Sequence, residues 1–254
     1  MKALSGLSNK ITIKQNDLIK ETYIYVDKYL DRANEIKVYE QLNQMNLDFL
    51  IVPFNWEFID NKMMSKTKYY EGAITLHETH ICVNKMKAII KLISKIHNLE
   101  LVDIKAFDPK GFLDFFIQNT KKCLFDLSEF KPKVESIIKS YWDDKTKPVF
   151  SHNDLVKGNF INYKKGWKVI DFEYGMYNHY LFDYASFISE SLNKKRWNVF
   201  INMLNLTSKE LSKLHDLIYY QNYLWIYWAS YMFEQTSEQI FVEITKEKIA
   251  NLTN

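Results

Sequence analysis

Three oxygen-bearing side chains are spaced so that they could support phosphoryl chemistry with a metal ion. Asp154 follows a polar turn, and Asn159 lies five residues further along the chain. Residues 160–163 alternate like a short strand, and 168–170 form a returning strand that ends at Asp171. We expect this hairpin to gather the three side chains at one edge. Two carboxylates and an amide oxygen are hard ligands, which suit Mg²⁺ held together with substrate phosphates.

The same spacing occurs in protein kinases. There an Asp of the catalytic loop takes the proton of the attacking hydroxyl, an Asn five residues later holds Mg²⁺, and the Asp of an Asp-Phe-Gly motif holds metal. This chain departs from protein kinases at Asn153, where they have Arg, and at Glu173, where they have Gly. The alternative is a hairpin whose polar residues are merely solvated, and the joint pattern disfavours it.

The central motifs closely resemble those of the choline/ethanolamine kinases, and more distantly those of the aminoglycoside phosphotransferases. The matching stretches are Ser-His-Asn-Asp at 151–154 with Gly158-Asn159, Ile-Asp-Phe-Glu-Tyr at 170–174, Phe-Asp-Tyr-Ala at 182–185, and Glu190. The resemblance is specific over this region and looser elsewhere. It implies ATP and Mg²⁺ as cofactors, with Asp154 as the catalytic base and Asn159 and Asp171 as metal ligands.

The resemblance also implies a fold. We expect an α+β, two-lobed protein kinase-like structure, with a small β-rich N-terminal nucleotide-binding lobe at 1–70 and a larger, mostly helical catalytic and substrate-binding lobe at 71–254. The segment around Tyr70 resembles the hinge of this superfamily, where exposed backbone groups would bind adenine. Periodicity predicts further strands and helices, over 54–59, 63–70, 84–97, 112–127, 134–142 and from 208 towards 228.

Candidate nucleotide-binding residues lie in the first lobe. Ser8 and Asn9 follow Gly6 in a turn that resembles the short phosphate loop of choline kinases, although an ordinary hairpin turn explains the residues equally well. Residues 22–30 alternate like a strand and carry Lys28 on the apolar face. Seven residues later Glu35 opens an amphipathic helix, so a lysine–glutamate pair that orients phosphates is predicted. The alternative is two surface charges.

The acceptor site is predicted from aromatic residues. Thr207 to Glu210 form a capping box that starts a helix, and this helix carries Trp225 and Trp228 three residues apart, on one face. Such tryptophans usually fill a core. Choline kinases place a similar pair against the trimethylammonium group, which cannot donate hydrogen bonds and is bound by aromatic faces. The resemblance therefore implies a box of Tyr174, Glu190, Trp225 and Trp228, with Phe241 as a candidate further aromatic.

Bulk properties exclude several classes of protein. The 254 residues are 47% hydrophobic and 16% aromatic, which excludes a disordered chain. The 34 basic and 31 acidic residues are interspersed, so no nucleic-acid-binding face is expected. The apolar runs are too short to span a membrane, and the first residues lack the apolar core of a signal peptide. We expect a soluble, cytoplasmic protein without membrane insertion.

The sequence thus predicts an ATP-dependent small-molecule kinase that phosphorylates the hydroxyl of an amino alcohol, with choline as the preferred acceptor. Ethanolamine, thiamine, an aminoglycoside or a related sugar are alternative acceptors for the same fold. An alternative of another class is a nucleotide-binding pseudokinase that serves as an interaction module. The intact Asp154, Asn159 and Asp171 argue against the pseudokinase.

Overall fold

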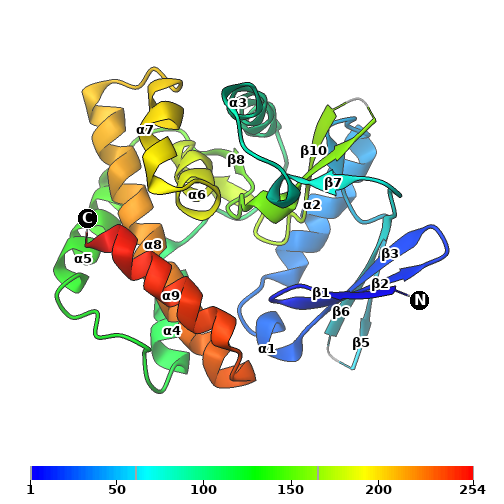
Figure 1. Cartoon of the computed structure of the whole chain (residues 1–254), viewed down its shortest axis with the longest axis horizontal. Helices are drawn as coiled ribbons and strands as arrows, with labels where there is room; N and C mark the ends of the chain where they lie inside the picture. Colours follow the sequence, from blue (N-terminus) through cyan, green and yellow to red (C-terminus); the bar gives the residue numbers. More distant parts are fainter. Residues whose placement is uncertain (1, 61, 165, 254) are drawn as a thin grey trace. The chain divides into compact units, whose positions relative to one another are not determined.

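The chain folds as two compact units (Figure 1), and the computed structural model describes residues 2–60, 62–164 and 166–253. The first unit consists of Met1–Lys105 and Val149–Tyr177, and the second of Ala106–Pro148 and Asn178–Asn254. The central motifs are therefore divided between the units, with Asp154 to Tyr174 in the first and Glu190 in the second. This division rests on packing, and the predicted lobe boundary near residue 70 stays a prediction.

An antiparallel sheet of five strands forms much of the first unit. Its spatial order is β1-β2-β3-β6-β5, with bounds Lys2–Ser5, Asn9–Lys14, Asp17–Thr22, Lys62–Lys68 and Asn55–Ile59. The strands predicted over 54–59 and 63–70 are confirmed as β5 and β6. The turn predicted between them includes Asn61, which lies outside the described residues.

The strand predicted over 22–30 is wrong. β3 ends at Thr22, and the short helix α1 spans Ile24–Asp27. The alternation misleads because it does not mark a buried face: Val26 is fully buried, but Ile24 is 50% exposed. Asp27, the last residue of α1, stabilises the turn that follows this helix, because its carboxylate accepts a hydrogen bond from Arg32 Nε at 2.6 Å. Lys28 follows α1 and is exposed.

A second sheet carries the predicted central hairpin. Its order is β4-β10-β9-β7, with bounds Leu50–Ile51, Gly166–Ile170, Phe160–Tyr163 and Ile74–Thr75. β9 and β10 pair antiparallel, which confirms the hairpin, and β4 joins β10 in parallel. The pair β8 and β11, Val149–Ser151 and Met176–Asn178, lies on either side of the hairpin in sequence.

Two long helices complete the first unit, α2 over Arg32–Met45 and α3 over Val83–His97. α3 confirms the helix predicted over 84–97, although its N-cap is Cys82 and Asn84 lies inside it. Its buried stripe packs against β8 and β10, as an amphipathic helix should. The fully buried members of that stripe are Met86, Ile89, Ile93 and Ile96.

The second unit is helical. Its helices are α4 to α9, with bounds Pro109–Asn119, Lys131–Asp143, Leu181–Ser191, Lys194–Asn202, Ser208–Thr236 and Gln239–Leu252. The helix predicted over 112–127 is too long, because α4 ends at Asn119. Beyond this end the backbone bonds to α8 instead of continuing a helix: Lys122 N donates to Glu234, and Leu124 N donates to Ser230 Oγ at 3.1 Å.

The longest helix, α8, begins as predicted. Thr207 Oγ1 accepts a hydrogen bond from Glu210 N at 3.3 Å, and Glu210 Oε2 accepts one from Thr207 N at 2.8 Å. This reciprocal capping box satisfies amide groups that have no partner within the helix. α8 packs against α4, α5, α6 and α9, so it is the central helix of its unit.

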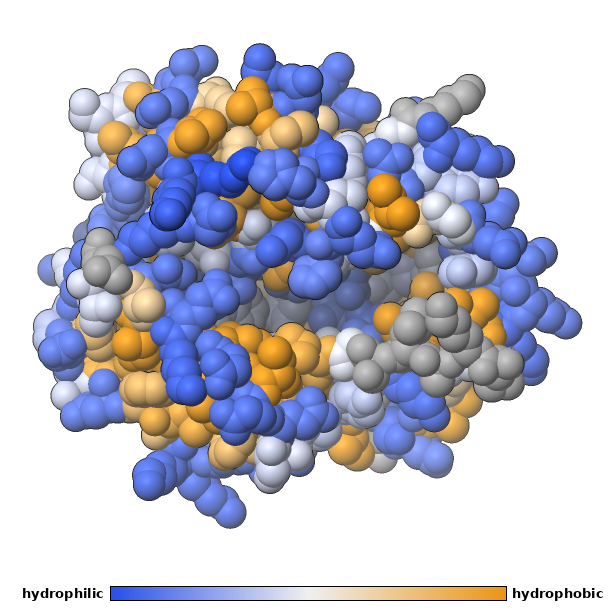
Figure 2. Space-filling view, viewed as in Figure 1, coloured by the Kyte–Doolittle hydropathy of each residue, from blue (hydrophilic) through white to orange (hydrophobic). Residues whose placement is uncertain are grey.

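Hydrophilic residues cover most of the face shown in Figure 2, and apolar residues appear between them in smaller patches. α8 is long enough to cross a bilayer, but it is not apolar enough. No other helix in the described part of the chain is both long enough and apolar enough.

Asn34 joins three segments of the first unit. Its Nδ2 donates to the carbonyl of Gly175 at 2.8 Å, and its Oδ1 accepts from the amide of Lys105 at 2.9 Å. Asn34 is buried on α2, and both partners lie far away in sequence. Gly175 has little room beside it, because an added Cβ would lie 3.1 Å from the carbonyl of Phe172. Asn34 therefore fixes the segment that follows Asp171 against α2.

We expect Asn34→Ala to lower the free energy of unfolding by about 1–3 kcal/mol, because it leaves buried backbone groups without partners. The measurement is urea denaturation followed by circular dichroism. Glu40→Ala, at an exposed position of the same helix, is the control and should change little. Equal destabilisation by both variants would contradict this role for Asn34.

Candidate active site

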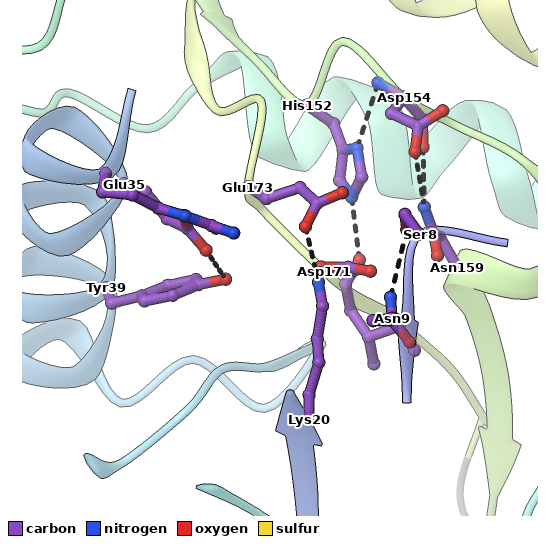
Figure 3. Close-up of polar contacts among 12 residues, drawn as sticks. Ser8, Asn9, Lys20, Glu35, Tyr39, His152, Asp154, Asn159, Asp171 and Glu173 are labelled. Carbon is purple, nitrogen blue, oxygen red and sulfur yellow. Dashed lines mark hydrogen bonds and ion pairs between the residues drawn. The ribbon is translucent and has the colours of Figure 1, made fainter. Parts of the chain in front are cut away.

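Asp154 and Asn159 are brought together by the loop that follows β8. The 3₁₀ turn Lys157–Asn159 ends this loop and leads directly into β9. Asn159 Nδ2 donates to the main-chain carbonyl of Asp154 at 2.8 Å, and lies 3.4 Å from its carboxylate oxygen Oδ2 (Figure 3). Because the amide nitrogen faces these acceptors, the amide oxygen of Asn159 is the atom that can accept or ligate.

His152 ties this loop to the end of β10. Its Nε2 lies 2.8 Å from the carbonyl of Ile170, and its Nδ1 lies 3.3 Å from the amide nitrogen of Asp154. A carbonyl can only accept, so Nε2 carries the proton and Nδ1 accepts from the amide. The fully buried imidazole is therefore neutral in this arrangement and braces the chain on both sides of the hairpin.

Asn153 braces the same loop from the other side. Its backbone is left-handed, with φ of 67°, a conformation that Asn tolerates better than most residues. The side chain is buried, and its Nδ2 donates to the carbonyl of Tyr174 at 2.8 Å. An Arg at this position, as in protein kinases, could not make that compact contact.

Asp171 follows β10 and meets a lysine of the first sheet. Its own backbone is left-handed as well, with φ of 68°. Lys20 Nζ, on β3, lies 2.5 Å from Asp171 Oδ1 and 2.6 Å from Glu173 Oε2 (Figure 3). One mostly buried ammonium thus bridges two carboxylates that lie two residues apart. Strained backbone of this kind persists where surrounding contacts hold it.

The electrostatics of this cluster follow from its burial. Burial by itself would lower the pKa of the Lys20 ammonium, but the carboxylates of Asp171, Glu173 and Glu35 raise it, and the net shift is upward. Burial raises the pKa of Glu173, against the opposing effect of Lys20, and Asp171 adds to the rise. Lys20 therefore stays charged at neutral pH and compensates the neighbouring acids.

Glu35 is buried on the first turn of α2, but its partners lie on its own helix. Tyr39 Oη donates to Glu35 Oε1 at 2.6 Å, and Arg32 forms an ion pair with Glu35 Oε2. Glu35 also contributes to the raised pKa of Lys20, so its carboxylate acts on the same lysine electrostatically. The predicted helix glutamate is thus close to the cluster, and Tyr39 and Arg32 hold it in place.

The lysine of the cluster is Lys20, and the strand that was expected to carry Lys28 is not formed. Lys28 is exposed and lies outside any strand. Sequence reasoning missed Lys20 because it treated the following segment as the strand. A signal was present: residues 17–22 follow a polar turn after the alternating residues 11–13, as the second strand of a hairpin does.

The turn at Gly6–Asn9 has a defined geometry. The amide of Gly6 donates to the carbonyl of Asn9 at 2.9 Å, and Asn9 Nδ2 lies 3.1 Å from Ser8 Oγ. An added Cβ on Gly6 would lie 2.8 Å from Asn9 Oδ1, so a larger residue would displace this side chain. Asn9 is buried and Ser8 is partly exposed. The geometry is that of a tight hairpin turn, and its role towards phosphates stays a prediction.

Tyr70 follows β6 at the predicted hinge. Its ring packs edge-on against Tyr163 of β9, with centroids 4.9 Å apart. Its carbonyl accepts a hydrogen bond from the amide of Ala73 at 3.1 Å, in a turn that leads to β7. This contact joins the first sheet to the hairpin sheet, and the proposed role of the hinge towards adenine remains untested by it.

The predicted acceptor residues belong to different units. Tyr174 is buried in the first unit, and burial raises the pKa of its phenol well above the ordinary value. Trp225 and Trp228 lie on α8 in the second unit, with ring centroids 5.5 Å apart in an edge-to-face arrangement. Phe241 of α9 packs against Trp228 at 5.6 Å. The second unit thus contains an aromatic group of three rings, Trp225, Trp228 and Phe241.

Glu190 is paired with a lysine that sequence reasoning missed. Lys248 Nζ, on α9, lies 2.5 Å from Glu190 Oε1 and 3.1 Å from the carbonyl of Ser189. The two side chains are 3% and 15% exposed, respectively. The only signal in the sequence was a lysine on the stripe that otherwise contains Phe241, Thr245 and Leu252, the other buried residues of α9.

The oxygen atoms of the cluster are suited to Mg²⁺. Among the described residues, His, Cys, Asp and Glu alone do not form a group of three that could hold a metal ion. The amide oxygen of Asn159 and the carboxylate of Asp171 supply hard ligands of the kind that Mg²⁺ uses when substrate phosphates complete its coordination. These residues fit an ion that is bound together with a nucleotide.

Comparisons with known proteins agree with this geometry. Residues 23–252 match a family model described as choline/ethanolamine kinase. A protein of Arabidopsis thaliana named probable ethanolamine kinase is 26% identical over 209 residues, which are 74% of this chain and 54% of that protein. The chain therefore spans about half the length of this curated relative.

Solved structures show the same fold. The crystal structure of LicA in complex with AMP has a TM-score of 0.78 and 21% identity, and covers 100% of this chain and 91% of that one. The choline kinase LicA from Streptococcus pneumoniae has a TM-score of 0.77 and 22% identity, and covers 99% and 92%. The predicted α+β, kinase-like fold class is confirmed.

Proposed function

Because the chain belongs to the choline/ethanolamine kinase family, we propose that it is an ATP-dependent kinase that phosphorylates the hydroxyl of an amino alcohol. The observation that carries this proposal is the braced loop of Asp154 and Asn159, tied by His152 to the strand that delivers Asp171 to Lys20. The AMP in the similar LicA structure supports an adenine nucleotide.

In the proposed reaction the acceptor hydroxyl attacks the γ-phosphorus of ATP, its proton passes to the carboxylate of Asp154, and ADP leaves. Asp154 is partly exposed and can reach a substrate, whereas His152 is fully buried and engaged at both nitrogens. Asn159 and Asp171 would hold Mg²⁺, which when bound neutralises phosphate charge that develops during transfer.

Lys20 takes the role that the sequence suggested for Lys28. Its mostly buried ammonium bridges Glu173 and Asp171, and Asp171 is one of the proposed metal ligands. We assign it to the nucleotide phosphates, with Glu35 supporting it electrostatically. Further proposed nucleotide contacts are Ser8 in the tight turn before β2, Asn9 at the start of β2, and the backbone at Tyr70.

Choline is the preferred acceptor in this proposal, because the second unit offers an aromatic group for a quaternary ammonium. Ethanolamine is the second candidate, favoured by the name of the curated relative. Tyr174, predicted as part of the same box, lies in the first unit, and its part in acceptor binding stays a prediction. A pseudokinase would bind nucleotide without turnover. The next experiment distinguishes a pseudokinase from an active kinase by measuring ADP release.

Asp154→Asn should lower kcat by about 10²- to 10⁴-fold, because a positioned base contributes about that much. ADP release is measured with choline, ethanolamine, thiamine and an aminoglycoside for the wild-type chain and the variant, and ATP affinity is measured by calorimetry. ATP affinity should change little. A wild-type chain that releases no ADP with any acceptor would overturn the proposed activity.

Lys20→Met should lower kcat/KM for ATP at least about tenfold, the effect of losing one or two charge-assisted hydrogen bonds to phosphate. Lys28→Met is the matched control and should leave it near the wild-type value, since Lys28 is exposed and outside the sheet. Calorimetric titration of ATP with Mg²⁺ and with a chelator accompanies both variants. Equal losses in the two variants, or equal ATP affinity with and without Mg²⁺, would contradict these assignments.

Trp228→Ala should raise the KM for choline about tenfold or more with a smaller change in kcat, because a desolvated cation–π contact is worth about 2 kcal/mol. Trp142→Ala, on α5 and 52% exposed, is the control. Melting temperatures are recorded for both, because Trp228 also packs on Phe241. An unchanged KM in a folded Trp228 variant would remove the aromatic group from acceptor binding.

A further inference from the structure

Glu190, the acid expected to balance the charge of the substrate, already forms an ion pair with Lys248. Lys248 Nζ lies 2.5 Å from Glu190 Oε1, and Ser189 Oγ lies 3.2 Å from the same oxygen. The lysine is buried, and its second acceptor is the carbonyl of Ser189. Glu190 Oε2 can still accept a hydrogen bond, but the Glu190–Lys248 pair as a whole carries no net charge.

The pair and the aromatic group lie along the same faces of α8 and α9. Phe241, Thr245 and Lys248 are buried at i, i+4 and i+7, along one face of α9. On α8, Gln221 Oε1 lies 3.3 Å from Ser189 Oγ, and Trp225 follows one turn later on the same face. These contacts run through the interior of the second unit, because the linking side chains of Gln221, Thr245 and Lys248 are buried. They connect the aromatic group, at Trp225 and Phe241, with the paired carboxylate.

The pairing affects the two candidate acceptors differently. A quaternary ammonium binds to aromatic faces and needs no hydrogen-bond acceptor. A primary ammonium is strongly hydrated, and it loses that hydration at little cost only where an unpaired carboxylate replaces it. A carboxylate whose charge is already balanced attracts a primary ammonium much less, while the ring faces are unaffected.

We infer that Lys248 is a positioning residue that sets the acceptor specificity: by pairing with Glu190 it denies a primary ammonium a free carboxylate and favours a quaternary one. The inference rests on the proposed function, because it takes the aromatic group of the second unit as the ammonium site. A merely structural ion pair would contribute to stability and leave the preference between acceptors unchanged.

The test compares choline and ethanolamine with the 254-residue chain. Lys248→Met should raise the ratio of kcat/KM for ethanolamine to that for choline by about tenfold, the effect of one charge-assisted hydrogen bond. The change should appear in the KM for ethanolamine and hardly in kcat. Lys248→Arg keeps the pair and should keep the wild-type ratio. Lys246→Met, an exposed lysine of the same helix paired with Glu243 at 3.1 Å, is the control.

A second variant covers the case in which Lys248→Met does not fold because Glu190 is left unpaired. In Glu190→Gln/Lys248→Met both charges are gone, so no carboxylate becomes free and the wild-type ratio should persist. If Glu190 itself held the substrate's ammonium, this double variant would lose ethanolamine selectively. That loss, or an unchanged ratio in folded Lys248→Met, would overturn the inference.

Direct binding separates this inference from the proposed activity. Calorimetric titration with choline and with ethanolamine gives the ratio of affinities for each variant without turnover. If the chain binds both acceptors but releases no ADP, the proposed activity is refuted. The inference about Lys248 is then decided by the ratio of the two affinities in each variant. A chain that binds neither refutes the inference, because no ammonium site then exists.

Discussion

The first unit depends on one buried ammonium placed between two carboxylates. Lys20 joins β3 to Asp171 and Glu173, which are more than one hundred residues away in sequence. Without the lysine the two acids would repel each other in a buried setting, where uncompensated charge is costly. The five-stranded sheet and the hairpin sheet are therefore linked by charge as well as by packing. Because Asp171 is the proposed metal ligand, the same contact connects the fold to its proposed chemistry.

Around this cluster, the residues that brace the site are distinct from the residues proposed to react. His152, Asn153 and Asn34 are buried and use their side-chain polar groups on backbone atoms. Asp154 remains partly exposed, and the oxygen of Asn159 faces away from its own hydrogen bonds. A fixed backbone that holds a few oxygen-bearing side chains in place suits phosphoryl transfer, since positioning and electrostatics supply most of its catalysis.

In the second unit, the proposed acceptor site relies on aromatic rings and not on polar oxygen atoms. Its aromatic rings can attract a cation without hydrogen bonds, and the carboxylate of Glu190, in the same unit, is paired with Lys248. A site of this kind selects by the hydration of the ammonium more than by its charge. Burying the ammonium of Lys248 costs free energy, and its ion pair with Glu190 offsets that cost.

The sequence alone determined the features that depend on local spacing. The interval from Asp154 to Asn159, the hairpin that ends at Asp171, the capping box of α8 and the stripe of α3 are short-range patterns, and the structure contains each of them. Only the tertiary structure decided which lysine forms an ion pair with which carboxylate. Lys20 replaced Lys28 in the cluster, and Lys248 emerged as the partner of Glu190. An ion pair across a long stretch of chain depends on packing that brings distant elements together, and periodicity over a few residues carries no information about it.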